Sequence, residues 1–449
     1  MPGAMHLEEY VAPHCNAALT FYRAGFDLPV YVMFSSGTTG SPKCMVQGCG
    51  VTLNHMKEAA LHMDINAKQR IFWFTTTGWM MWQWLLGAAL GRGAAAVLYD
   101  GDPFYPKKAQ LWQIAKEAEL DVFGTSAPWL SACTSSAGQA NPKTLGLNFD
   151  KLRIVASTGS PAGENVFSWV SENVIGKDGK APQFVSTSGG TDLNGSFFGG
   201  NPWLPVYDGQ LQGVILGMDV TVLDDSGTKD LSNSGALGEL SCRRGFPSAP
   251  LYFMGDSPAA EKYRAAYFDT DFANGVVWRH GDFCSMDPKT GGFVIHGRSD
   301  ATLNPGGVRI GTAEVYRALH ELSLTISPAP FVDYLVVGQP VTGADGTPDV
   351  RVILFLKLEG GDIGRVSQDL VTLVKSHVRI ACSPRHVPSV VCAVADIPYT
   401  TNGKKVEIAV LRALTRQPVT NRGALSNPDS LDFFSTSLCL QLLDELAHD

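Results

Sequence analysis

The stretch Phe34-Ser35-Ser36-Gly37-Thr38-Thr39-Gly40-Ser41-Pro42-Lys43 decides how this chain is interpreted. An apolar run at 30–34 predicts a strand before it, and residues 51–62 beyond it have the apolar spacing of a helix. A loop of glycines and hydroxyls with one cation offers the N–H groups and positive charge that a polyphosphate needs. It differs from a P-loop, because Pro42 separates Gly40 from Lys43. The stretch therefore predicts a phosphate-binding loop of another kind, against the alternative of a plain Ser/Gly-rich turn.

The composition is that of an ordinary globular protein. The 449 residues are 45% hydrophobic and 17% charged, which is enough for two or more domains with sizeable cores. A net charge of −8 disfavours a general nucleic-acid binder. The nine cysteines form no CxxC pairs, which predicts reduced thiols and a cytoplasmic location.

Residues 71–91 carry no charge and raise the question of a membrane span. Residues 75–78 and Gln83 interrupt the apolar run, and Arg70 and Arg92 flank it. The pattern therefore favours a buried strand, turn and helix, and we expect no membrane span.

Strand-like and helix-like segments alternate from residue 94 onward. The expected strands are 94–99, 121–125, 151–157 and 183–188, and the expected helices are 107–119, 128–136 and 164–174. Such alternation predicts a mostly parallel sheet covered by helices, in which ligands gather at the carboxyl ends of the strands. Three loops rich in Gly, Ser and Thr are expected at those ends, namely 35–41, 157–160 and 186–191.

The other segments have different patterns of apolar and polar residues. Residues 8–24 predict a helix without a motif, and 205–294 predict a β-rich subdomain. A compact α+β unit follows the loop at 297–309. Its expected helices are 312–322 and 367–380, its expected strands are 332–337, 350–358 and 389–395, and a polar tail ends in a helix at 437–447.

The opening stretch resembles the phosphate-binding loop of adenylate-forming enzymes, a superfamily that includes acyl-CoA synthetases, luciferases and the adenylation domains of peptide synthetases. Further segments are similar to the superfamily's motifs and follow in the same order: 157–161 (STGSP), 186–192 (STSGGTD), 278–282 (WRHGD), 297–300 (GRSD), 308–310 with Glu314, and 401–405 (TNGKK). The resemblance implies an α/β fold with a large domain at 1–299 that includes the β-rich subdomain. A small C-terminal α+β domain at 300–414 and a tail at 415–449 follow.

The same resemblance implies roles for individual residues. The implied nucleotide contacts are Ser35, Ser36, Gly37, Thr38, Thr39, Gly40, Lys43, Gly159, Ser160, Pro161, Ser188, Gly189, Gly190, Thr191, Asp282, Arg298, Gly307 and Arg309. Thr191, Asp192 and Lys404 are the implied catalytic residues, and Asp192, where the superfamily commonly has Glu, would hold Mg²⁺. Asp300 is the implied hinge. His280 and His296 are interpreted as packing residues and not as bases.

The implied chemistry has two steps. A substrate carboxylate attacks the α-phosphorus of ATP, and a thiol then takes the acyl group from the adenylate. Catalysis of the first step needs charge neutralisation more than a general base. Residues 33–36, 77–82, 188–192 and 426–431 are similar to the branch of the superfamily that joins acetoacetate to CoA, so ATP, acetoacetate and CoA are the expected substrates.

The acyl pocket is less defined by the sequence. Trp79 and Gly189 are the residues predicted to line it, because two glycines at 189–190 stand where relatives that activate acetate have larger residues. The aromatic and methionine cluster at 73–84 fits an acyl pocket and an apolar core equally well.

Several alternatives stay open from the sequence. They are another short-chain acyl-CoA synthetase, a luciferase-like oxygenase and a non-catalytic nucleotide-binding relative. A carrier-loading adenylation domain is disfavoured, because the tail after Leu414 is too short for the carrier domain that would be expected to follow it. In the superfamily a long region precedes the phosphate loop, whereas here the loop begins at residue 34. The resemblance therefore implies that the N-terminal part of the large domain is missing, with low stability and impaired activity as the expected result. The oligomeric state is left open.

Overall fold

A parallel sheet of five strands organises the larger part of the molecule, which the computed structural model describes over residues 5–34, 43–136, 138–305, 310–342, 348–401, 403–419 and 422–448. The strand order is β4-β3-β5-β6-β7, and all neighbours run parallel. The strands are β3 (Arg70–Trp73), β4 (Ala95–Val97), β5 (Val122–Ser126), β6 (Ile154–Thr158) and β7 (Gln183–Ser186).

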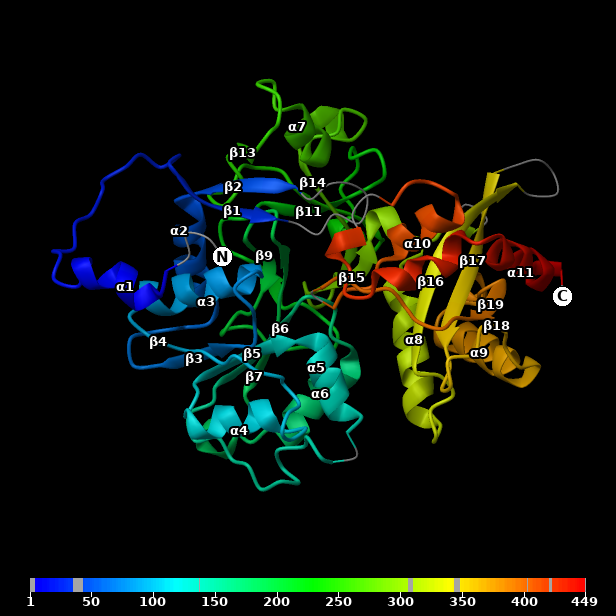
Figure 1. Ribbon diagram of the computed structural model, residues 1–449, viewed down its shortest axis with the longest axis horizontal. Helices are drawn as coiled ribbons and strands as arrows, with labels where there is room; N and C mark the ends of the chain where they lie inside the picture. Colours follow the sequence, from blue (N-terminus) through cyan, green and yellow to red (C-terminus); the bar gives the residue numbers. More distant parts are fainter. Residues whose placement is uncertain are drawn as a thin grey trace.

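Helices cover both faces of this sheet (Figure 1). Alternate side chains of a strand point to opposite faces, so Ile71 and Trp73 of β3 join one hydrophobic core and Phe72 joins another. The first core takes α2 (Gly50–Lys57), its π-helical continuation (Glu58–His62) and α3 (Met80–Gly91). The second takes α4 (Gln110–Glu117), α5 (Ala127–Thr134) and α6 (Glu164–Asn173).

The predicted alternation of strands and helices is confirmed, with two corrections. The helix expected at 8–24 is limited to α1 (Leu7–Val11) and a 3₁₀ turn at Ala12–His14. Residues 5–29 are exposed throughout, so no tertiary packing extends this short helix, and Pro13 disfavours its continuation. The strand expected at 30–34 is present as β1 (Pro29–Phe34), but it pairs antiparallel with β2 (Cys44–Gly48) and lies outside the parallel sheet.

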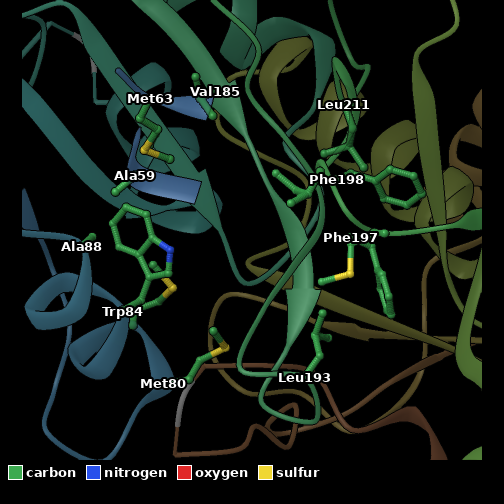
Figure 2. Packing of buried hydrophobic residues seen from close by; sticks show 14 of the residues in the cluster. Ala59, Met63, Met80, Trp84, Ala88, Val185, Leu193, Phe197, Phe198 and Leu211 are labelled. Atoms are coloured by element: carbon green, nitrogen blue, oxygen red, sulfur yellow. The ribbon is translucent and has the colours of Figure 1, made fainter. Parts of the chain in front are cut away.

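Smaller sheets complete the larger part. β1 and β2 associate with β13 (Tyr252–Phe253), and β8 (Ser188–Gly190) pairs with β9 (Gly195–Gly199) beside β10 (Gly213–Val214). The predicted β-rich subdomain is a four-stranded sheet of β11 (Val220–Leu223), β12 (Gly238–Cys242), β14 (Trp278–Met286) and β15 (Phe293–Arg298), with α7 (Glu261–Tyr267) nearby. The first core extends into this region: Figure 2 shows Trp84 and Met80 of α3 in the same cluster as Phe197 and Phe198 of β9.

The smaller part, at the right of Figure 1, contains a four-stranded sheet in the order β16-β17-β19-β18. Its strands are β16 (Asp333–Thr342), β17 (Pro348–Lys357), β18 (Gly364–Arg365) and β19 (Val390–Ala393). One face packs on α8 (Thr312–Thr325) and α9 (Gln368–Ala381), and the other packs on α10 (Glu407–Leu414) and α11 (Ser437–His448). Cys439 and Leu443 of the C-terminal segment therefore belong to this domain's core. The predicted domain boundaries and the tail division at 415 stay predictions.

None of the helices in the described ranges has the length and apolar content needed to cross a bilayer. The uncharged stretch at 71–91 forms β3, a turn and the 12-residue α3, as the sequence predicted, whereas a crossing helix needs about 20 residues.

Candidate functional site

Asp192 is the centre of a cluster of polar side chains that come from distant segments. It follows β8, and its Oδ1 accepts hydrogen bonds from Lys43 Nζ at 2.9 Å and from the Tyr267 hydroxyl at 2.5 Å. Lys43 immediately precedes β2, and its ammonium also lies 4.6 Å from the centre of the Tyr267 ring. Tyr267, the last residue of α7, stacks on Trp278 with ring centres 3.7 Å apart. The packing of Tyr267 thus fixes the position of the carboxylate.

The Asp192 carboxylate is strongly held in its ionised form. Burial raises its pKa, but the charges of Lys43 and His280 and the hydrogen bond from Tyr267 outweigh burial and lower the pKa to about 2. Asp192 is therefore an anion at neutral pH, although its side chain is only 21% exposed.

A second group of charges lies where the larger part ends. Asp282 of β14 and Arg298 of β15 form an ion pair, with Nη1 3.2 Å from Oδ1. Because β14 and β15 pair with Asp282 opposite Arg298, the sheet register sets this contact. Arg298 also reaches Asp300 (Nε–Oδ1 3.4 Å), and His280 Nε2 lies 3.6 Å from Asp282 Oδ2. Asp282 and Arg298, two of the implied nucleotide contacts, and Asp300, the implied hinge, thus lie together in space.

Lys404 connects the smaller part to these charges. Its side chain is exposed to solvent, yet the charges of Asp282, Asp192 and Arg298 all act on its pKa. Although the side chain reaches solvent, the surrounding protein removes much of its hydration, and this desolvation lowers that pKa. The charge of Arg298 also lowers the pKa, while the two carboxylates oppose the change. The structure therefore brings Lys404 and Asp192, two predicted catalytic residues that are 212 positions apart in the sequence, into one electrostatic environment.

The loops that follow β6 and β7 lie side by side, as their parallel pairing requires. Thr158 Oγ1 donates to the carbonyl of Thr187 at 3.1 Å, and the Thr187 N–H donates to the carbonyl of Ser157 at 2.9 Å. Gly159 has φ +97°, and a Cβ there would lie 3.7 Å from the Trp79 ring. Trp79 is therefore next to Gly159, one of the implied nucleotide contacts.

The aromatic and methionine cluster divides between core and edge. Trp73, Met80, Met81 and Trp84 are buried in the first core, whereas Trp79 is only partly buried. Trp73, Met81 and Trp84 also border a cavity of about 10 Å³, which holds about one water molecule. The core interpretation thus accounts for these buried side chains, and Trp79 stays the predicted pocket residue.

The space beside Gly189 is filled in this structure. A Cβ at Gly189 would lie 2.0 Å from the carbonyl oxygen of Gly195 on β9. Glycine at this position permits the close approach of two backbones. The pocket role of Gly189 stays a prediction, but its lack of a side chain is explained by the pairing of β8 with β9.

Lys405, next to Lys404, is enclosed by three tyrosine rings. Its ammonium lies 4.7, 5.0 and 5.6 Å from the ring centres of Tyr334, Tyr399 and Tyr316. It also donates to Asp333 Oδ1 and to the Tyr334 carbonyl, each at 2.5 Å. The contacts anchor the loop that carries Lys404, because cation–π and charge-assisted hydrogen bonds strengthen when they are shielded from water.

We expect Lys405→Met to lower the free energy of unfolding by about 3 kcal/mol, because it leaves the largely buried Asp333 carboxylate without its cation. Denaturant unfolding followed by circular dichroism measures this loss. The double variant Lys405→Met/Asp333→Asn is the matched control and should recover part of the stability. A single variant as stable as the parent would contradict an anchoring role for Lys405.

Some predicted residues lie outside the described ranges. These are Ser35, Ser36, Gly37, Thr38, Thr39, Gly40, Gly307 and Arg309. Ser160 and Pro161 are exposed, and Ser188, Gly190 and Thr191 are half-buried near Asp192. The roles of all these residues in nucleotide binding stay predictions.

Sequence reasoning missed Tyr267 and Asp333. Tyr267 belongs to no motif and reaches Asp192 only through the fold, and Asp333 lies in a strand whose pattern indicates packing alone. No signal in the sequence marks either residue.

Comparison with known proteins identifies the class to which this fold and these charges belong. The AMP-binding enzyme family matches residues 23–249, and the chain belongs to that family. The curated relatives it resembles include acetoacetyl-CoA synthetases from Rhizobium meliloti (strain 1021), with 44% identity, and from Danio rerio, with 42%. The alignments cover 96% and 97% of this chain, and the chain spans 62% and 61% of the length of these relatives.

Solved structures agree with this placement. An acetoacetyl-CoA synthetase from Streptomyces lividans matches with a TM-score of 0.82 and 36% identity, over 95% of this chain and 61% of the other. The anthranilate CoA ligase AuaEII matches with a TM-score of 0.72 and 17% identity, over 93% of this chain and 72% of the other, which shows the fold alone. The predicted α/β adenylate-forming fold is confirmed.

Proposed function

We propose that this chain activates acetoacetate with ATP and transfers the acyl group to CoA, giving acetoacetyl-CoA, AMP and pyrophosphate. The observation that carries the proposal is the convergence of Lys404, Lys43 and Arg298 with the carboxylates of Asp192 and Asp282. Relatives named acetoacetyl-CoA synthetases, at 42–44% identity, support the choice of acid. We also propose a cytoplasmic location, where ATP and CoA are available.

The first step brings together two anions that repel each other, the carboxylate of the acid and ATP. The cations of the site can reduce this repulsion. A carboxylate oxygen of the acid forms a bond to the α-phosphorus, and the bond from that phosphorus to pyrophosphate breaks. Lys404 and Lys43 offset the negative charge, and neither needs to transfer a proton. Asp282 and Arg298 would orient the nucleotide, in the roles that the resemblance implies.

Asp192 fits a site for Mg²⁺. It is ionised at neutral pH, and a magnesium ion is commonly held by one or two carboxylates together with substrate phosphates. In the described ranges no group of three or more His, Cys, Asp or Glu side chains could hold a metal ion. Asp192 would thus supply one ligand, and the ion would contribute positive charge beside the phosphates.

In the second step the sulfur of CoA attacks the acyl carbonyl carbon. The C–S bond forms, the C–O bond to AMP breaks and the thiol proton passes to solvent. We propose that the small domain first turns about Asp300, as the resemblance implies, which would withdraw Lys404 from the phosphates. Asp300 lies between the last core residue of the larger part, Phe293, and the first of the smaller part, Leu303.

Pyrophosphate release from the purified 449-residue chain tests this function. We expect release that depends on acetoacetate, and acetoacetyl-CoA as the product when CoA is present. Parallel reactions with acetate, 3-hydroxybutyrate and hexanoate give the acid preference. If another acid gives faster pyrophosphate release, that acid and not acetoacetate is the preferred substrate. ATP binding without release under any condition would favour a non-catalytic nucleotide-binding relative.

A further inference from the structure

A carboxylate shared by two histidines joins the larger and smaller parts. Glu314, in the first turn of α8, accepts from His296 Nδ1 at 3.1 Å and from His386 Nε2 at 2.5 Å. His296 belongs to β15 of the larger part, and His386 follows α9 in the smaller part. We call these three residues the histidine–carboxylate bridge.

The bridge is shielded from solvent and its tautomers are defined. The side chains of His296, Glu314 and His386 are 12%, 21% and 11% exposed. A carboxylate only accepts hydrogen bonds, so each facing ring nitrogen must carry a proton. Burial raises the pKa of Glu314, but the hydrogen bonds and charges of the two histidines outweigh it and hold the pKa well below its usual range. Removing one histidine would leave a partly buried anion with fewer partners.

Close backbone packing also holds the start of α8 against β15. A Cβ at Gly311, the residue before α8, would lie 2.2 Å from the carbonyl oxygen of His296. Arg317 of α8 also pairs with Glu164 of α6 at 3.4 Å, but these side chains are 44% and 63% exposed, and such exposed pairs contribute little. The bridge and the glycine contact therefore fix the start of α8 against β15.

Helix α8 connects the histidine–carboxylate bridge to the loop that contains Lys404. Two residues after Glu314, the Tyr316 hydroxyl donates to Glu407 at 2.8 Å, and the Tyr316 ring faces the ammonium of Lys405. His296 is thus connected through α8 to the loop that presents Lys404.

Ser285 Oγ lies 3.0 Å from His296 Nε2, which completes the order Ser–His–carboxylate found in many hydrolases. Here the serine lies within β14, paired with Val294 of β15, and the carboxylate is shared with a second histidine. The arrangement fits a link between domains better than a nucleophile.

We propose that His296 is a positioning residue. Through Glu314 it holds the small domain in the orientation that presents Lys404 to Asp192 and Asp282. This inference rests on the proposed function, because it assigns the observed orientation to the adenylation step. The bridge stabilises the arrangement for the first step and has no part in attack by the thiol.

Two amide variants of His296 separate this role from general packing. His296→Asn keeps an N–H donor near the position of Nδ1, facing Glu314, whereas His296→Gln places its amide near the position of Nε2, facing Ser285. We expect His296→Gln to lower acetoacetate-dependent pyrophosphate release about tenfold, the scale of one lost charge-assisted hydrogen bond. His296→Asn should restore most of the rate. Conversion of supplied acetoacetyl-adenylate and CoA to thioester should be unchanged or faster in both variants.

Hydrogen exchange provides a readout that needs no activity. We expect His296→Gln to increase amide exchange at the start of α8 and in β15, with no change in α4. His320→Gln is the matched control, because His320 lies on the same helix and its Nε2 has no hydrogen-bond partner among the described residues. It should leave rates and exchange unchanged.

Each outcome decides the inference. Equal losses in both half-reactions, equal behaviour of the Asn and Gln variants, or unchanged exchange in His296→Gln would overturn it. If the parent releases no pyrophosphate, the proposed function fails. In that case increased exchange in His296→Gln but not in His296→Asn still supports the bridge as the contact that holds the small domain.

Discussion

Replacing Lys404 with alanine should reduce acetoacetyl-adenylate formation by at least ~10²-fold, the scale on which removing one charge-stabilising group acts. The ammonium of Lys404 lies in the field of Asp192, Asp282 and Arg298, so the substitution removes one positive charge from that group. We expect the loss in pyrophosphate release measured at saturating ATP and acetoacetate. Conversion of supplied acetoacetyl-adenylate with CoA should stay near the parent rate, because Lys404 acts before the small domain turns.

Lys375→Ala is a suitable control for this experiment. Lys375 also belongs to the smaller part, but it lies on α9 and donates to the carbonyl of Ser389. It should leave both half-reactions unchanged. An equal loss of both half-reactions in Lys404→Ala would show that the assignment of Lys404 to adenylation is wrong.

The Asp192→Asn variant should lose adenylation activity by roughly 10²- to 10³-fold. Asparagine preserves the size of the side chain but removes the negative charge that Lys43 and Tyr267 surround. It also removes the carboxylate proposed as a ligand for Mg²⁺, so half-maximal ATP binding should need a higher Mg²⁺ concentration. Calorimetric titration of ATP at several Mg²⁺ concentrations measures this shift independently of turnover.

Asp219→Asn supplies the comparison for Asp192→Asn. Asp219, just before β11, pairs with Arg243 and Arg244, just after β12, so the substitution removes an ion-paired carboxylate that plays no part in the proposed site. Unchanged turnover and unchanged Mg²⁺ dependence in Asp192→Asn would exclude the proposed role of Asp192.

The sequence predicts the fold well where local pattern and burial agree. The strands and helices between residues 94 and 188 are recovered within a few residues, because apolar periodicity directly reflects which side chains enter the two cores. Prediction fails at 8–24, where helical spacing exists but no partner surface packs against it. It is incomplete at 30–34, since a short apolar strand carries no information about its neighbours.

The site is predicted less completely, for a related reason. Motifs mark Asp192, Asp282, Arg298 and Lys404, and the structure groups them. Tyr267 and Asp333 are revealed only by tertiary contacts. Gly189 illustrates a different difficulty, because a glycine in the sequence fits an open pocket and close backbone packing equally well. Only the structure, in which the Gly195 backbone lies against Gly189, shows that close packing applies here.

The continuity of the first hydrophobic core has a consequence for folding cooperativity. One cluster includes Trp84 beside the parallel sheet and Phe293 in the β-rich sheet, whereas the two clusters of the smaller part begin at Leu303 and Leu335. A substitution that weakens packing anywhere in this cluster should therefore destabilise both sheets. We expect the two sheets to unfold together as one cooperative unit. The smaller part has its own cores and can unfold separately. The histidine–carboxylate bridge therefore couples the unfolding of two cooperative units.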